Sequence, residues 1–216
     1  MAQDFNIRLS KVKVALPGGR LLFQIPELTL AAGTHTLVQG ESGSGKTTFL
    51  HLLAGLFKPT EGDVYVGPNH LNQLNDNSLC DMRQQHVGVI FQKLNLIDHL
   101  TVNENVALSL SNSLSDKDDV VQRATSRVNL KGRGRDRCSY LSLGEQQRVA
   151  VARVLAQGPD VILADEPTSS LDQTNCNFVM QALREAARGK TLIVVSHDHR
   201  LEDQFEKVIQ FKDYAR

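Results

Sequence analysis

A glycine-rich loop at residues 40–48, GESGSGKTT, constrains the fold of this chain more than any other feature. The apolar stretch THTLVQ before it predicts a strand at 36–39, and the helical spacing of apolar residues after it predicts a helix at 47–57. A strand, a glycine loop and a helix start form an anion cradle, because glycine lets successive N–H groups point inward and the helix dipole adds partial positive charge. The pattern G-x-x-x-x-G-K-T therefore predicts a phosphate-binding loop.

In this loop we expect the Lys46 ammonium to meet the β and γ phosphates of a nucleotide and the Thr47 hydroxyl to ligate Mg²⁺. The alternative is a flexible Gly/Ser linker, but linkers rarely carry the lysine–threonine pair between a strand and a helix. The expected nucleotide-binding residues of the loop are Gly40, Glu41, Ser42, Gly43, Ser44, Gly45, Lys46, Thr47 and Thr48.

Composition limits the partners and the compartment. The 216 residues suffice for one domain, 1–216, and 24 Lys+Arg balance 24 Asp+Glu, so no charge argument favours nucleic acid as a partner. The cysteines at 80, 138 and 176 are far apart and odd in number, which indicates a reducing compartment and neither a disulfide framework nor a zinc site. Because no segment has the apolar length of a signal peptide or a membrane span, we expect a soluble, cytosolic protein.

The order of patterns along the chain indicates an α/β fold. Alternating residues over 5–38 and at 62–67 predict strands, and 68–84 reads as loop with a short helix. A strand is expected at 86–92, followed by a mainly helical region at about 93–157. Afterwards DVILAD, a helix at 172–188, TLIVVS and KVIQFK alternate strand with helix, which is typical of a parallel sheet. The basic run 131–137 is interpreted as a solvated loop.

A second site is expected where VILADEPT ends in Asp165 and Glu166. An apolar strand that ends in two acids places carboxylates at the edge of the sheet where α/β proteins bind ligands. Asp165 would hold Mg²⁺ through its water shell, and Glu166 would polarise the attacking water. Two surface acids that merely end a strand are the alternative, which the intact phosphate loop disfavours.

Two further polar residues follow predicted strands. His197 ends TLIVVSH, and its expected place beside the γ phosphate favours a functional role over a structural one. Gln92 follows HVGVIF, and its amide could accept from a metal-bound water and donate to the attacking water. We therefore assign Lys46, Glu166, His197 and Gln92 as candidate catalytic residues and Thr47, Gln92 and Asp165 as candidate metal ligands; Gln92 as a plain surface residue remains open.

Five motifs occur in one order: GESGSGKTT, VIFQ, LSLGEQQRVAVARVLA, VILADEPTSSLD and VVSHD. Over nearly the whole chain this order resembles the ATPase subunit of ABC transporters. The resemblance implies a P-loop NTPase-type fold: a mostly parallel sheet with an antiparallel β subdomain and an inserted α-helical subdomain. It also implies that Ser142, Gly144 and Glu145 bind the ATP held by an opposite subunit, so two copies sandwich two ATP molecules. The segment SSLD, ending at Asp172, is expected to cross the dimer interface.

The wording of the motifs is similar to the branch for lipoprotein release and macrolide export. That likeness implies an integral membrane permease-type partner, contacted near Gln92 and KLNLIDHL, and a place on the inner face of the cell membrane. Two alternatives stay open: a soluble ABC ATPase without a transporter, and a binding-only subunit latched by nucleotide. The homotypic or heterotypic nature of the dimer is open as well.

Two positions depart from the family pattern. Leu143 replaces the first glycine of the signature, so its side chain could crowd the phosphate or forbid a glycine-only backbone angle. Leu16 stands where an aromatic residue usually stacks on adenine, a loss on the order of 1 kcal/mol, and Phe23 is a candidate substitute.

Overall fold

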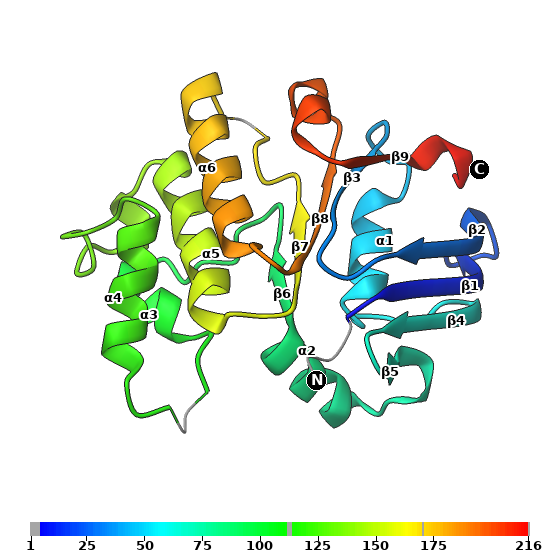
Figure 1. Cartoon of the computed structure of the whole chain (residues 1–216), viewed down its shortest axis with the longest axis horizontal. Helices are drawn as coiled ribbons and strands as arrows, with labels where there is room; N and C mark the ends of the chain where they lie inside the picture. Colours follow the sequence, from blue (N-terminus) through cyan, green and yellow to red (C-terminus); the bar gives the residue numbers. More distant parts are fainter. Residues whose placement is uncertain (1–4, 112–113, 170, 216) are drawn as a thin grey trace.

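The fold is described by a computed structural model that covers residues 5–111, 114–169 and 171–215. Within these residues the centre is a five-stranded sheet in the order β6-β7-β8-β3-β9, and every neighbouring pair is parallel (Figure 1). Its strands are β6 Val87–Ile90, β7 Val161–Asp165, β8 Thr191–Ser196, β3 His35–Gln39 and β9 Lys207–Gln210. The predicted parallel sheet is confirmed, and its carboxyl edge gathers the ends of β3, β7 and β8.

Both faces of the parallel sheet are covered, which explains its nearly continuous apolar strands. Along β7 the side chains alternate: Ile162 and Ala164 join one core with the helices α5 (Leu143–Gln157) and α6 (Gln173–Ala186), while Val161 and Leu163 join the other. The second core also holds α1, Lys46–Leu53, which lies between the two sheets. The sheet is therefore buried on both faces between two packed layers.

The second sheet is antiparallel, in the order β2-β1-β4-β5. Its strands are β1 Ile7–Ala15, β2 Leu21–Leu30, β4 Glu61–Val66 and β5 Asn69–His70. In β1 the inward-facing residues step from Leu9 to Val12, and the positive φ of Lys11 (51°) absorbs the extra residue. Beside it Gly62 admits no side chain, because a Cβ there would lie 2.3 Å from the Lys11 carbonyl oxygen. The expected antiparallel subdomain is confirmed.

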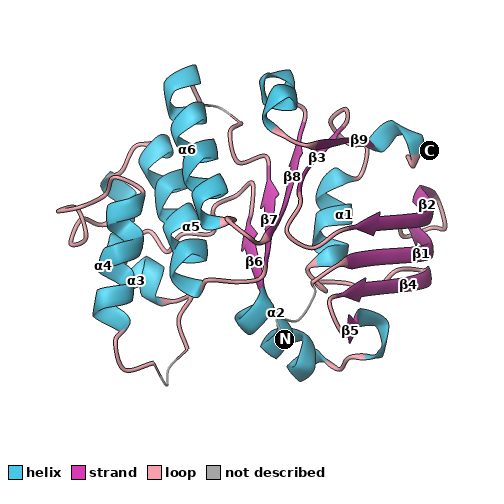
Figure 2. Ribbon diagram, in the orientation of Figure 1, coloured by secondary structure: helices cyan, strands magenta, loops and turns pink. Residues whose placement is uncertain are grey.

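The helical subdomain lies on the other side of the parallel sheet (Figure 2). It contains α3 Val102–Ala107, α4 Lys117–Arg127 and α5 Leu143–Gln157, which pack on one another, and α6 Gln173–Ala186 packs beside α5. A capping box of Thr101 and Glu104 opens α3. Loop 131–137 is mostly exposed, as expected, but Arg133 pairs with Asp136 and Glu145 and so holds the loop to the start of α5.

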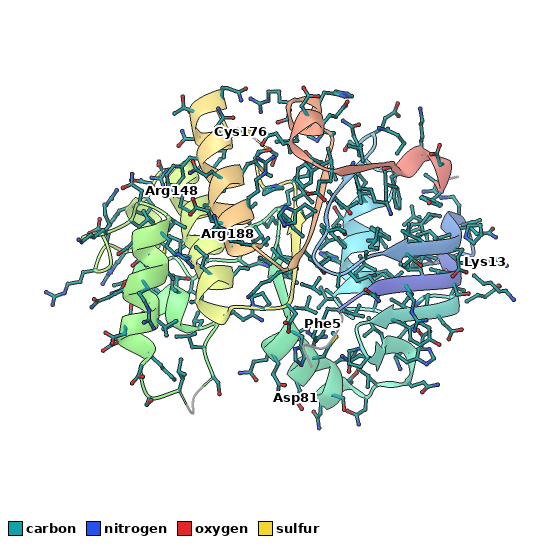
Figure 3. All side chains as sticks on the ribbon, viewed as in Figure 1. Phe5, Lys13, Asp81, Arg148, Cys176 and Arg188 are labelled. Atoms are coloured by element: carbon teal, nitrogen blue, oxygen red, sulfur yellow. The ribbon has the colours of Figure 1, made fainter. Side chains whose placement is uncertain are left out.

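Three boundaries differ from the sequence expectation. Helix α1 ends at Leu53 and not at residue 57, because Gly55 (φ 64°) closes it: its N–H bonds the Leu52 carbonyl, and the Leu56 N–H bonds the His51 carbonyl. The segment expected to hold a short helix contains the longer α2, Asp76–His86, against which Phe5 stacks at 4.8 Å from the His86 ring (Figure 3). Strand β6 ends at Ile90, two residues before Gln92.

Among the described residues, the longest helix has 15 residues, and none is both long and apolar enough to cross a bilayer.

Candidate functional site

The phosphate loop joins the end of β3 to the start of α1 as predicted. Gly43 and Gly45 have φ angles of 81° and 100°, a conformation that side chains rarely adopt. A Cβ on Gly40 would lie 3.2 Å from the Ser44 hydroxyl and 3.3 Å from Phe211 Cβ. The loop is thus built from backbone that only glycine allows at these points, and its N–H groups lead into the N-terminus of α1.

Lys46 is buried and folds back over this loop. Its ammonium donates to the carbonyl oxygens of Gly40, at 2.7 Å, and Glu41, at 2.9 Å, and lies 4.0 Å from Glu166 Oε1. Burial lowers the pKa of Lys46, while the carboxylates of Glu166 and Asp165 oppose that shift. Its ammonium therefore stands between the glycine loop and the carboxylates that end β7.

The two residues expected to hold a metal are brought together. Thr47 Oγ1 donates to Asp165 Oδ1 at 3.1 Å, and Asp165 is only 2% exposed at the end of β7. Burial raises the pKa of Asp165; the Thr47 hydrogen bond and the nearby His51 and Lys46 oppose the shift, and Glu166 adds to it. A hydroxyl beside a carboxylate is the hard-oxygen donor set that Mg²⁺ prefers, so these residues fit the expected ion.

Glu166 has a strained backbone conformation, and both of its carboxylate oxygens are held by neighbouring groups. Its φ of 47° is unusual for a residue other than glycine, and its backbone N–H bonds the Val195 carbonyl at 2.9 Å. One carboxylate oxygen, Oε1, accepts from the His197 backbone N–H at 3.1 Å and lies 2.8 Å from His197 Nδ1. Glu166 and His197, each expected at a strand end of this edge, are therefore in contact, with the His197 side chain 61% exposed.

Ser196 is a functional candidate that the sequence reasoning missed. Its buried hydroxyl donates to the other carboxylate oxygen of Glu166, Oε2, at 2.9 Å, and accepts from the Asp198 N–H at 3.1 Å. In the sheet register Ser196 pairs with Gln39, the last residue before the phosphate loop. In the sequence, the position of this hydroxyl residue directly before His197, at the end of a predicted strand, could have identified Ser196 as a candidate.

Gln92 follows β6 at the same edge of the sheet, where Ile90 pairs with Ala164, but no hydrogen bond among the described residues joins it to the other candidate catalytic residues. It is exposed, and its side chain makes no hydrogen bond to any residue in the described part of the chain. His51 lies one helical turn after Thr47, and it opposes the rise in the pKa of Asp165. Its ring centroid lies 5.7 Å from that of Phe91. The Nε2 atom of His51 is buried without a partner among the described residues. The role of Gln92 stays a prediction.

The signature residues lie at the start of α5, away from the phosphate loop. Ser142 and Glu145 form a capping box: the Ser142 hydroxyl accepts from the Glu145 N–H, and Glu145 Oε2 accepts from the Ser142 N–H at 2.8 Å. This backbone hydrogen bond, above all, holds the pKa of Glu145 below its usual range. Among the described residues no hydrogen bond or ion pair joins Ser142, Gly144 or Glu145 to residues 40–48.

Leu143 is an ordinary helical residue. It opens α5 with a φ outside the left-handed region and is 48% exposed. The concern that it forbids a glycine-only backbone angle is therefore wrong, because no such angle is needed here. Crowding of a ligand by its exposed side chain stays a prediction.

The segment after Glu166 leads from the carboxyl edge of the parallel sheet to α6. Ser169 Oγ donates to the Glu166 carbonyl at 2.9 Å, and Asp172 caps α6 by accepting from the Asn175 N–H at 2.9 Å. Ser170 lies outside the described residues.

Next to the carboxyl edge of the parallel sheet, a cavity of about 660 Å³ is lined by Gln39, Gly40, Glu41, Ser42, Ser44, His197, His199, Gln210, Lys212 and Ala215. A larger hollow of about 800 Å³ lies on α4, far from these carboxylates.

The expected adenine contact loses one candidate. Phe23 is fully buried in the core, with its ring 5.3 Å from Phe211 and 6.5 Å from Phe49, so it cannot stack on a base. Its inward position follows from the alternation of β2, in which Phe23 and Ile25 share a face. Leu16 is half-buried in the turn between β1 and β2.

Comparisons with known proteins agree with this geometry. Residues 23–169 match the ABC transporter family. The chain is 38% identical over 190 residues to the macrolide export ATP-binding/permease protein MacB 2 of Yersinia pestis bv. Antiqua, covering 86% of this chain and 28% of that protein. It is 36% identical over 214 residues to MacB of Burkholderia thailandensis, covering 96% of this chain and 33% of MacB. The chain thus spans about a third of the length of these curated relatives.

Solved structures show the same fold. The dimeric ATP-binding cassette MJ0796, bound to ADP and Pi in a post-hydrolysis state, superimposes with a TM-score of 0.86 at 33% identity over 95% of this chain and 94% of that one. A bacterial Atm1-family ABC exporter with ATP bound has a TM-score of 0.82 at 24% identity, over 98% of this chain and 38% of the exporter, and supports the fold alone. With the phosphate loop, the paired carboxylates and the capped signature helix all in place, this chain belongs to the ABC transporter family and is an ATP-binding cassette, an ATPase of that family.

Proposed function

We propose that the chain binds ATP with Mg²⁺ on residues 40–48, hydrolyses it in a site completed by a second cassette, and drives an integral membrane subunit. The observation that carries this proposal is the convergence of Lys46, Thr47, Asp165, Glu166 and His197 at one sheet edge. The N-terminus of α5, the second phosphate-binding element, is not bonded to that edge within the described chain.

In the proposed reaction Lys46 exchanges the carbonyls of Gly40 and Glu41 for phosphate oxygens, so its buried charge offsets the charge of the triphosphate. Thr47 and Asp165 would hold Mg²⁺, which supplies further neutralisation of the phosphates. Glu166 orients the attacking water, and Ser196 and His197 keep its carboxylate in place. Gln92 is proposed to reach this water or the ion when the second cassette closes.

The second cassette is proposed to supply Ser142, Gly144 and Glu145. The partial positive charge at the N-terminus of the 15-residue α5 and the Ser142 hydroxyl suit a γ phosphate. A dimer in which each copy clamps the ATP of the other is consistent with the dimeric MJ0796 cassette. The chain as it stands allows two identical copies or a related mate.

The membrane partner is inferred from the relatives named as ATP-binding/permease proteins, of which this chain spans about a third. We place the contact on the exposed segment after Gln92, where Ile97 is 36% exposed and Tyr140 lies exposed on the neighbouring turn. The cassette then lies on the inner face of the cell membrane through that partner. Its ATP hydrolysis powers export, lipoprotein release or mechanotransmission.

The test combines turnover with assembly. Wild-type chain should release phosphate from ATP only with Mg²⁺, and Glu166→Gln should bind ATP, lose turnover and accumulate as a dimer in light scattering. Glu27→Gln, at an exposed glutamate on β2, is the matched control and should behave as wild type. Monomeric Glu166→Gln protein at saturating ATP would contradict the proposed sandwich, and turnover unaffected by Glu166→Gln would contradict the proposed role of Glu166.

A further inference from the structure

Arg153 lies on α5, eleven positions after Ser142, and has no place in the proposed chemistry. Within the described residues it pairs with no carboxylate, but it donates four hydrogen bonds, two to the backbone of residues 94–95 and two to Asn105. Its Nε donates to the Asn105 carbonyl at 3.0 Å, and one terminal nitrogen donates to the carbonyls of Asn95, at 2.9 Å, and Leu94, at 3.4 Å. The other terminal nitrogen donates to Asn105 Oδ1 at 2.6 Å.

Asn105, on α3, continues this network and is fully buried. Its side-chain oxygen also accepts from the Ile97 N–H at 2.9 Å, and its side-chain nitrogen lies 3.0 Å from the Ile97 carbonyl oxygen and 3.1 Å from that of Thr101. The backbone of residues 94–101 is therefore held by two side chains, one on α5 and one on α3. We call Arg153 and Asn105 the hub.

The segment 94–101 lies between Gln92 and α3. Its far end is tied to the turn before the signature, since the Cys138 N–H bonds the Leu100 carbonyl at 3.1 Å and the Ser139 N–H bonds the Asp98 carbonyl at 3.2 Å. Three residues after Ser139, α5 is capped by Ser142. The same segment is thus attached both to the beginning of the signature helix and, through Arg153, to its body.

A guanidinium suits this task and an ammonium does not. Its planar fork sends donors in several fixed directions, whereas lysine carries one compact charge at the end of a flexible stem. Arg153 is half-buried, and this burial lowers its pKa, so part of the charge is desolvated at a cost without a carboxylate partner among the described residues. An apolar residue would pack this helix with less cost, which points to a requirement for the backbone contacts themselves.

We propose that Arg153 is a positioning residue that locks segment 94–101 to α5, so that when the N-terminus of α5 engages ATP the segment moves with it. Through this lock the motion reaches Gln92, two residues before the segment, and the exposed Ile97 side chain within it. The coupling step rests on the proposed function, but the lock itself is a property of the chain alone.

The experiment compares Arg153→Lys with wild type and with Arg123→Lys, an exposed arginine-to-lysine control on α4 outside the hub and the site. Amide hydrogen exchange of residues 94–101 is measured without nucleotide and with ATP and Mg²⁺, the latter in the Glu166→Gln background. Thermal melting and binding of a fluorescent ATP analogue are measured on the same samples. Arg153→Gln, which buries no unpaired charge, replaces Arg153→Lys if the lysine variant does not fold.

Without nucleotide, Arg153→Lys should raise exchange of 94–101 by about tenfold, the loss expected for one or two hydrogen bonds, with melting and analogue affinity close to wild type. In the Glu166→Gln protein that keeps Arg153, the parent in this comparison, ATP should change the exchange of residues 94–101. Arg153→Lys in the same background should abolish that change. Unchanged nucleotide-free exchange, or loss of analogue binding together with global unfolding in both variants, overturns the lock. If the parent itself shows no response to ATP, the proposed function fails while the nucleotide-free comparison still decides the lock.

Discussion

Ser196→Ala removes one hydroxyl from the buried carboxylate that we assign to water activation. The hydroxyl donates to Glu166 Oε2 at 2.9 Å and accepts from the Asp198 N–H at 3.1 Å, so its loss leaves a charged acceptor and a backbone donor without these partners. Hydrogen bonds to charged groups are worth about 1.5–3 kcal/mol, which corresponds to a decrease in kcat of roughly 10- to 150-fold. The KM for ATP should change little, because Ser196 contacts no residue of the loop 40–48 by a hydrogen bond.

The assay is steady-state phosphate release. Ser196→Thr is the control that retains the hydroxyl, and Glu166→Gln is the inactive reference. The threonine variant should keep most of the wild-type kcat despite a methyl group added in a fully buried position. If Ser196→Ala turned over ATP at the wild-type rate while Glu166→Gln was inactive, the hydroxyl would not position the carboxylate and the reasoning would be refuted.

Three other changes give distinct outcomes. Lys46→Ala should abolish ATP binding in calorimetry, because it removes the ammonium that donates to the carbonyls of the glycine loop; retained affinity would contradict its role. Asp165→Asn should melt at a higher temperature than wild type without nucleotide: the raised pKa means that ionising Asp165 costs folding stability, so the gap should open as pH rises above about 4, and a gap that closes with rising pH would contradict this. Leu143→Gly should strengthen ATP-dependent dimerisation in sedimentation if the exposed leucine crowds the mate, and equal or weaker dimerisation would dismiss that idea.

The core of the site could be predicted from the sequence because parallel strands end at one edge. In the sheet register Gln39 lies beside Ser196 and Asp165 beside Val195, so residues that follow these strands must meet. Strand ends and a glycine loop were therefore enough to bring Lys46, Asp165, Glu166 and His197 together.

The rest depends on local geometry that no periodicity encodes. Gln92 follows a strand that ends two residues early, so its side chain is placed by a loop and not by the sheet. Ser196 bonds to a glutamate whose backbone φ is positive, and no sequence pattern predicts that conformation at Glu166. By contrast, the expectations for Phe23 and for the end of α1 were wrong although strand alternation and the glycine at position 55 were signals that could have corrected them.

The central claim is that one copy holds ATP and its mate completes the site, and a mixing experiment tests it most directly. Lys46→Ala protein lacks the phosphate-loop lysine, and Ser142→Arg protein lacks the signature hydroxyl, so each alone should be inactive. Mixed in equal amounts they should recover about a quarter of the wild-type rate, since half of the dimers are mixed and each mixed dimer has one complete site. No recovery at any ratio, with mixed dimers demonstrated to form, would contradict a site shared between copies.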